Sequence, residues 1–160
     1  MKTLIQIFLL IFAYSVTYGE AKPLKVPTAL SPQGIEVAVE GLSNDAREWG
    51  LSKSLIQSKV EQTLLGFNLE PSDDEPLLKG YLYVNVSLVG SAYNVAVVYE
   101  RPVEIPQQSG YIHATVWDNT GTGIDTTRDK YSILSVLEEK TSIFATEYIK
   151  QNRKPTLWES

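Results

Sequence analysis

Residues 81–104 read YLYVNVSLVGSAYNVAVVYERPVE, two runs of alternating apolar and polar side chains on either side of a glycine. This period of two is typical of β-strands that bury one face and expose the other. In the first run the apolar row is Leu82, Val84, Val86 and Leu88. The turn Gly90-Ser91-Ala92 predicts that the two strands form an antiparallel hairpin with a connection of about three or four residues.

Two further elements are predicted ahead of this hairpin. Residues 34–39 alternate in the same way and predict a first strand, and the connection after it has the character of a single helical turn. Ser52 is a natural N-cap for a helix over 53–65, in which one stripe faces the core. The stripe consists of Ile56, Val60, Leu64 and Phe67. Residues 70–76 predict a solvated loop.

Downstream of the hairpin, a break at 106–110 precedes a strand predicted over 111–117. There the row Ile112, Ala114 and Val116 is expected to face the core. Residues 118–125 contain Asn and two glycines and predict a turn. A second amphipathic helix is predicted over about 132–151. Its apolar face comprises Ile133, Val136, Leu137, Lys140, Ile143, Phe144 and Tyr148.

This order of elements, β-α-β-β-β-α, predicts an α+β fold. We expect a two-layer sandwich in which a four-stranded, mostly antiparallel sheet carries two helices on one face. The other face of the sheet is then open to solvent or to a partner.

The N-terminal segment predicts export. Met1-Lys2 followed by the apolar run Leu4–Phe12 indicates a signal peptide over 1–19, cleaved after Gly19 or alternatively after Ser15. An uncleaved interfacial anchor is the other interpretation of the same segment. We expect an extended leader over 20–33, one domain over 34–153 and a tail over 154–160, in a periplasmic or secreted protein.

Composition narrows the class further. A chain of 160 residues with 43% hydrophobic and 21% charged residues is typical of one globular domain. The absence of cysteine excludes a disulfide scaffold and a lipid-modified cysteine. A net charge of −5 argues against nucleic acid as a partner, and no segment of the mature chain is predicted to span a membrane.

The open sheet face is the predicted binding site. If the aliphatic rows point at the helices, the alternate rows point away from them, and they carry aromatic residues where a solvated face usually carries charged ones. Such a surface favours contact with a protein, a lipid or a glycan. Cross-strand aromatic pairing that only stabilises the sheet is the alternative. The predicted binding residues are Tyr81, Tyr83, Tyr111, His113, Thr115 and Trp117.

No catalytic residue, metal site or cofactor is predicted. His113 is the only histidine, and without cysteine it does not form an ordinary zinc site. The segment from Asp118 to Asp125 lacks the spacing of a calcium loop, and Gly121 and Gly123 alone do not make a phosphate loop.

Three short sequences suggest a resemblance: Gly50-Leu51-Ser52 before the first helix, Leu82-Tyr83-Val84 in a strand, and Tyr111–Trp117. With these the chain resembles small exported bacterial proteins of unassigned function. Its order of elements is similar to that of the outer-membrane partner in lipopolysaccharide transport and of the N-terminal domain of the Tol propeller protein. The resemblance implies an accessory role in the cell envelope.

We therefore expect a non-enzymatic binding or envelope accessory domain that uses the open sheet face or a sheet edge. A small secreted hydrolase or glycan-active enzyme using Asp118, Asp125 or His113 is the alternative. Homodimerisation through the aromatic face is a third hypothesis.

Overall fold

The computed structural model describes residues 34–72, 80–105 and 111–152. The predicted signal peptide (1–19), leader (20–33) and tail (154–160) lie outside these ranges. So do the break at 106–110 and residues 73–76 of the predicted loop.

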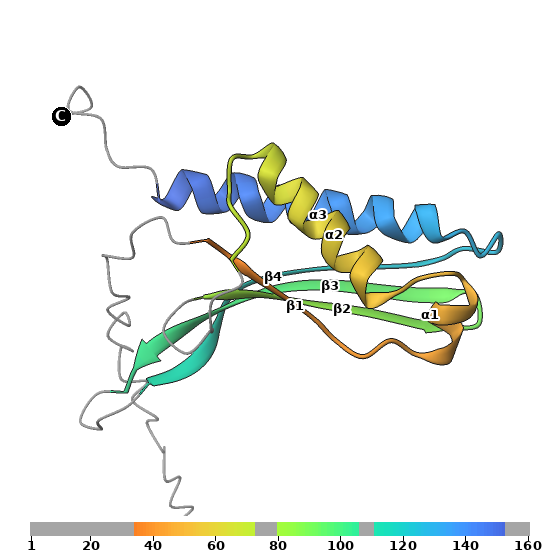
Figure 1. The fold of residues 1–160 in the computed structure, drawn as a ribbon. Coiled ribbons are helices and arrows are strands. Elements are labelled where there is room, and N and C mark those ends of the chain that lie inside the picture. The colour runs from red at the N-terminus through yellow and green to blue at the C-terminus, as the bar shows by residue number, and fades with distance from the viewer. Residues whose placement is uncertain (1–33, 73–79, 106–110, 153–160) are drawn as a thin grey trace, which may run out of the picture.

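The chain forms a mixed four-stranded sheet with helices on one side of it (Figure 1). The strands lie in the order β1-β2-β3-β4, with β1 parallel to β2 and the other pairs antiparallel. The predicted α+β fold is confirmed, with a short helix in the first connection. The elements are β1 (Glu36–Val39), α1 (Asn44–Glu48), α2 (Lys53–Gly66), β2 (Tyr81–Val89), β3 (Ala92–Glu104), β4 (Tyr111–Ile124) and α3 (Lys130–Asn152).

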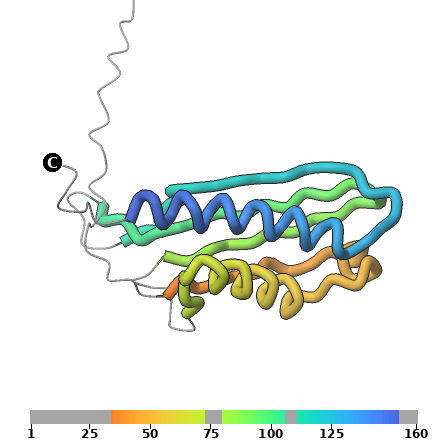
Figure 2. Tube along the Cα trace, turned by 90° about the horizontal axis from the view of Figure 1, so that it is seen from above, coloured from red at the N-terminus to blue at the C-terminus, as the bar shows by residue number. Residues whose placement is uncertain are grey.

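Both long helices cover the same face, as predicted. Seen from above, α2 and α3 run side by side along the sheet, α2 on the β1 side and α3 on the side of β3 and β4 (Figure 2). The core lies between these two layers. Its largest fully buried side chains come from both helices and from β2 and β3, with Phe144, Ile56, Leu82 and Leu137 among them.

Each of the first two helices begins at a serine cap. The Ser52 hydroxyl accepts a hydrogen bond from the Leu55 amide at 3.1 Å, and the Ser43 hydroxyl accepts one from the Ala46 amide at 3.2 Å. These bonds satisfy amides that have no partner within the first turn. The stripe predicted for α2 is buried at Ile56, Val60 and Leu64.

The β2–β3 hairpin is tighter than predicted. Val89 pairs with Ala92, so the connection is the two residues Gly90-Ser91 rather than about three or four. Gly90 has a φ of +60°. A two-residue hairpin turn requires positive φ at its first position, and glycine adopts it without steric cost.

The turn predicted over 118–125 is wrong, because β4 continues to Ile124. Its glycines serve close packing instead of chain reversal. A Cβ on Gly121 would lie 3.0 Å from Val136 Cγ1 in α3, and one on Gly123 would lie 2.5 Å from the Tyr93 hydroxyl oxygen. Glycine is therefore needed at both positions, because neighbouring side chains occupy the space that a Cβ would fill.

A β-bulge interrupts the pairing of β3 with β4. Tyr99 pairs with Trp117 and Glu100 pairs with Thr115, which leaves Val116 as the extra residue. A bulge of this kind shifts the alternation of side chains between the two faces. Trp117 and Thr115 consequently lie on opposite faces of the sheet.

Candidate functional site

The face of the sheet opposite the helices is the candidate site, and we call it the open sheet face. Pairing and alternation place Glu36 of β1, Tyr81 of β2, Glu100 of β3 and Thr115 of β4 in one row across all four strands. Of the predicted binding residues, this face carries Tyr81, Tyr83, Tyr111, His113 and Thr115.

Tyr81 is the centre of this row. Its hydroxyl donates a hydrogen bond to Glu100 Oε2, and its ring centroid lies 5.2 Å from that of His113. The hydrogen bond to the Glu100 carboxylate, followed by desolvation, raises the pKa of Tyr81 to about 12. Tyr81 thus contacts both an aromatic ring, that of His113, and a carboxylate, that of Glu100, on the open sheet face.

A second tyrosine–carboxylate pair lies towards the β1 edge. Hydrogen bonding to Glu40 is the main cause of the raised pKa of Tyr83. The Asn85 side-chain amide also donates to Glu40 Oε2, and Ser87 donates to Asn85 Oδ1 at 2.9 Å. A polar network therefore extends along β2 from the tyrosines.

Two buried polar atoms on the same face are left without a hydrogen bond. Glu36 Oε2 and His113 Nδ1 have no hydrogen-bond partner within the described part of the chain. A buried carboxylate oxygen without a partner is costly, and a cationic or hydrogen-bonding ligand relieves that cost.

The charge of this face was not foreseen from the sequence. Among the described strand residues the open sheet face carries no lysine or arginine. Its charged residues are Glu36, Glu100, Glu104 and Asp118 in the strands and Glu40 directly after β1. The signal was present in the alternation of Glu36 with Val37 and of Glu100 with Tyr99. These carboxylates come together only through the pairing of β1, β2 and β3, which the alternation within one strand does not specify.

Trp117 does not lie on the open sheet face, where it was predicted together with the other binding residues. Its ring packs on Phe144 with centroids 5.2 Å apart, and its Nε1–H donates to Glu147 Oε2 at 2.7 Å. Both partners belong to α3, so Trp117 lies on the helix-covered face. The bulge at Val116 is the reason, since alternation counted forward from Thr115 through a regular strand would place Trp117 on the open sheet face.

The row Ile112, Ala114 and Val116 was predicted to face the core, but it does not enter the core. Ile112 is 50% exposed and Val116 is 45% exposed. The core residues of α3 lie opposite the part of the sheet beyond Val116, where Tyr99 and Trp117 pair.

Two residues named for the enzymatic alternative, His113 and Asp125, lie far apart along β4. His113 and Asp125 are separated by most of β4, roughly 40 Å at about 3.3 Å per residue. Asp125 instead accepts hydrogen bonds from Thr127, at 2.8 Å from its amide and 2.5 Å from its hydroxyl, which lower the pKa of the carboxyl. Among the described residues no group of three or more His, Asp or Glu side chains could hold a metal ion.

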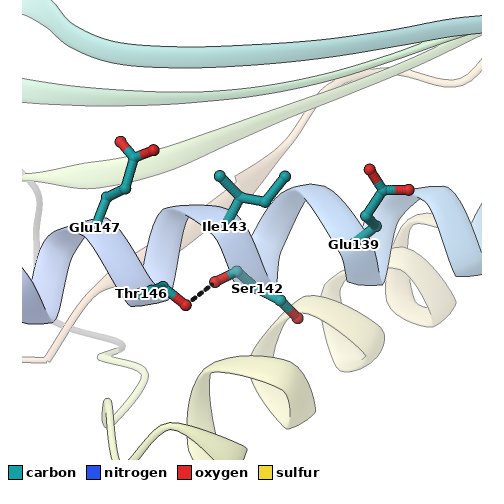
Figure 3. Close-up of a pocket in the computed structure, with 5 residues that line it drawn as sticks. All are labelled: Glu139, Ser142, Ile143, Thr146 and Glu147. Atoms are coloured by element: carbon teal, nitrogen blue, oxygen red, sulfur yellow. Dashed lines mark hydrogen bonds between the residues drawn. The ribbon is translucent and has the colours of Figure 1, made fainter.

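A shallow depression lies on α3. Figure 3 shows Glu139, Ile143 and Glu147 projecting from the helix, with Ser142 and Thr146 beside them. The Thr146 hydroxyl donates to the Ser142 carbonyl oxygen at 2.8 Å. All five lining residues come from one helix, so the depression has no wall from a second element.

Within the described ranges, none of the helices has the length and apolar character needed to cross a membrane. No protein-family model matches the chain, and no curated protein matches it. Two solved structures are similar in part. A minor lipoprotein from Acinetobacter baumannii has 12% identity and a TM-score of 0.31, covering 77% of this chain and 92% of its own. An uncharacterized protein has 10% identity and a TM-score of 0.36, covering 78% and 94%. At such low values neither similarity bears on the function of this chain.

Proposed function

We propose that this chain is an exported, non-enzymatic binding domain whose open sheet face contacts a basic surface of a protein partner in the cell envelope. The observation that carries the proposal is the row Glu36–Tyr81–Glu100 with His113 against Tyr81. Export is the expectation from residues 1–19.

The chemistry of the face selects the partner. Tyrosine rings next to carboxylates attract lysine and arginine side chains through cation–π and charge interactions. Glu36 Oε2, which has no hydrogen-bond partner among the described residues, adds an acceptor for such a cation. An anionic lipid or nucleic acid would instead meet like charge on this face.

Photocrosslinking in the exporting cell tests the proposal. A photoreactive residue is placed separately at Tyr83 and Thr115 on the open sheet face, with Glu139 on α3 as the control position. We expect a discrete protein adduct from the two sheet positions and not from Glu139. Neutralising the row with Glu36→Gln and Glu100→Gln should reduce the yield of this adduct, and added salt should do the same.

Two results would overturn the proposal. One is the absence of adducts at both sheet positions when the protein is folded and exported. The other is an adduct that persists unchanged after both glutamates are neutralised, because charge would then have no part in recognition.

A further inference from the structure

A cavity of about 210 Å³ lies on the other side of the sheet, between the C-terminal half of α3 and the region of the bulge in β4. Its walls include Tyr99, Trp117, Phe144 and Tyr148. These rings form one connected cluster, with Phe144 5.1 Å from Tyr99, 5.2 Å from Trp117 and 5.4 Å from Tyr148 between centroids. Tilted and edge-on contacts of this kind leave ring faces and edges available to a further flat group.

Arg101 gives this aromatic cavity a positive end. It lies two residues after Tyr99 in β3 and therefore on the same face of the sheet, and it lines the cavity. Its Nε is buried and has no hydrogen-bond partner in the described ranges. It also takes no part in the ion pairs formed there, which are Lys59–Glu138 and Lys140–Glu139.

The carboxylate that also lines the cavity forms no ion pair with Arg101 among the described residues. Glu147 also lines the cavity, but its Oε2 accepts the indole hydrogen bond of Trp117 and its side chain is exposed to solvent. Arg101 lies close enough to Tyr99 to oppose the rise that burial causes in the pKa of its hydroxyl. An arginine with a free donor next to aromatic walls is suited to an anion on a planar apolar body.

We propose that this cavity binds a small planar apolar molecule carrying a carboxylate or a phosphate. The ring would lie among Tyr99, Trp117 and Phe144, and the anionic group would accept hydrogen bonds from Arg101. The volume suits one or two fused rings, because a cavity of about 150 Å³ already accepts benzene. The site is independent of the proposed partner surface, which lies on the opposite face of the sheet.

NMR titration of the full mature chain tests this site with 2-naphthoate as the probe. The indole Nε1–H signal of Trp117, assigned with Trp117→Phe, reports on the cavity, and that of the buried Trp49 serves as an internal reference. We expect the Trp117 signal to move with saturation and the Trp49 signal to stay in place. The neutral 2-naphthylmethanol should bind at least about tenfold more weakly, which is the size expected for losing a hydrogen bond to a charged group.

Arg101→Gln and Arg47→Gln form a matched pair, since Arg47 is an exposed arginine on α1. Arg101→Gln should weaken 2-naphthoate about tenfold and leave 2-naphthylmethanol unchanged, while Arg47→Gln should change neither. A comparison of 2-naphthyl phosphate with 2-naphthoate then shows which anion the site prefers.

The proposal is overturned if saturating 2-naphthoate leaves the Trp117 signal in place. It is also overturned if the acid and the alcohol bind equally and Arg101→Gln affects neither. Both readouts are measured on isolated protein, so they are separate from the photocrosslinking result.

Discussion

At the scale of single residues, the open sheet face is defined by tyrosine hydroxyls that donate to glutamates. Tyr81 donates to Glu100 across the β2–β3 pair, and Tyr83 is paired with Glu40 next to β1. Each bond favours the neutral tyrosine, because a phenolate would face a carboxylate. The two bonds therefore keep Tyr81 and Tyr83 protonated over the whole physiological range.

The Tyr81–Glu100 bond has a measurable consequence at high pH. The pKa of Tyr81 is raised to about 12 in the folded protein, against an ordinary value of 10.0. A raised pKa contributes stability that is present below about pH 10 and is lost as pH rises towards about 12. We expect Glu100→Gln to lower the pKa of Tyr81 towards 10.0, as measured by the ¹³Cζ shift of tyrosine. It should also flatten the fall in unfolding free energy between pH 10 and 12.

Glu104→Gln is the matched control, because Glu104 lies on the same strand and pairs with Tyr111 instead of Tyr81. It should leave the Tyr81 titration unchanged. If Glu100→Gln also leaves it unchanged, the hydrogen bond does not exist in solution.

At the scale of elements, β4 departs most from what local sequence predicts. Asp, Asn and Gly at 118–123 favour a turn by composition. Thr120, Thr122 and Ile124 in the same segment are β-branched and favour a strand. The conflict is resolved by long-range packing, since Val136 and Lys140 of α3 lie over Gly121 and the Tyr93 ring lies over Gly123.

Replacing Gly123 tests this account of β4. A Cβ there would lie 2.5 to 2.9 Å from Tyr93 ring and hydroxyl atoms, so the ring must move. We expect Gly123→Ala to lower the unfolding free energy by about 1–3 kcal/mol, measured by urea denaturation. Gly66→Ala is the control, because nothing lies within 4 Å of its added Cβ and alanine favours the end of α2. It should be neutral or stabilising by up to about 1 kcal/mol. Equal stability of the two variants would contradict this account of β4 and favour the turn predicted over 118–125.

At the scale of the whole molecule, one core joins the helix layer to the sheet. Buried residues from α1, α2, α3, β1, β2 and β3 form a single cluster. The sheet's other face contributes nothing to this cluster, so it is free to carry charged and aromatic groups. The core and the proposed partner surface thus lie on opposite faces of the same strands.

Because the core is a single cluster, shortening a buried side chain is expected to destabilise the helices and the sheet together. Leu137 of α3 is fully buried, whereas Leu65 of α2 is 53% exposed. We expect Leu137→Ala to lower the unfolding free energy by about 2–5 kcal/mol, with tryptophan fluorescence and far-ultraviolet circular dichroism changing together. Leu65→Ala should change it by less than about 1 kcal/mol. If the two signals separated in Leu137→Ala, the helices and the sheet would not unfold as one unit.

By itself the sequence determined the parts of this protein that rest on local periodicity. The period of two in 81–104 gave the hairpin and its faces, and the spacing of Ile56, Val60 and Leu64 gave α2 and its buried stripe. These patterns are sufficient because a strand or a helix that buries one side repeats it at a constant interval.

Only the tertiary structure decided where Trp117 points, how far β4 runs and which charges gather beside the tyrosines. A single extra residue at Val116 reverses the faces that alternation assigns, and nothing in the local pattern marks it. The meeting of Glu36, Tyr81 and Glu100 depends on pairing between strands far apart in the chain. Local sequence specifies the side of a strand, but the neighbours on that side are specified by strand order and register.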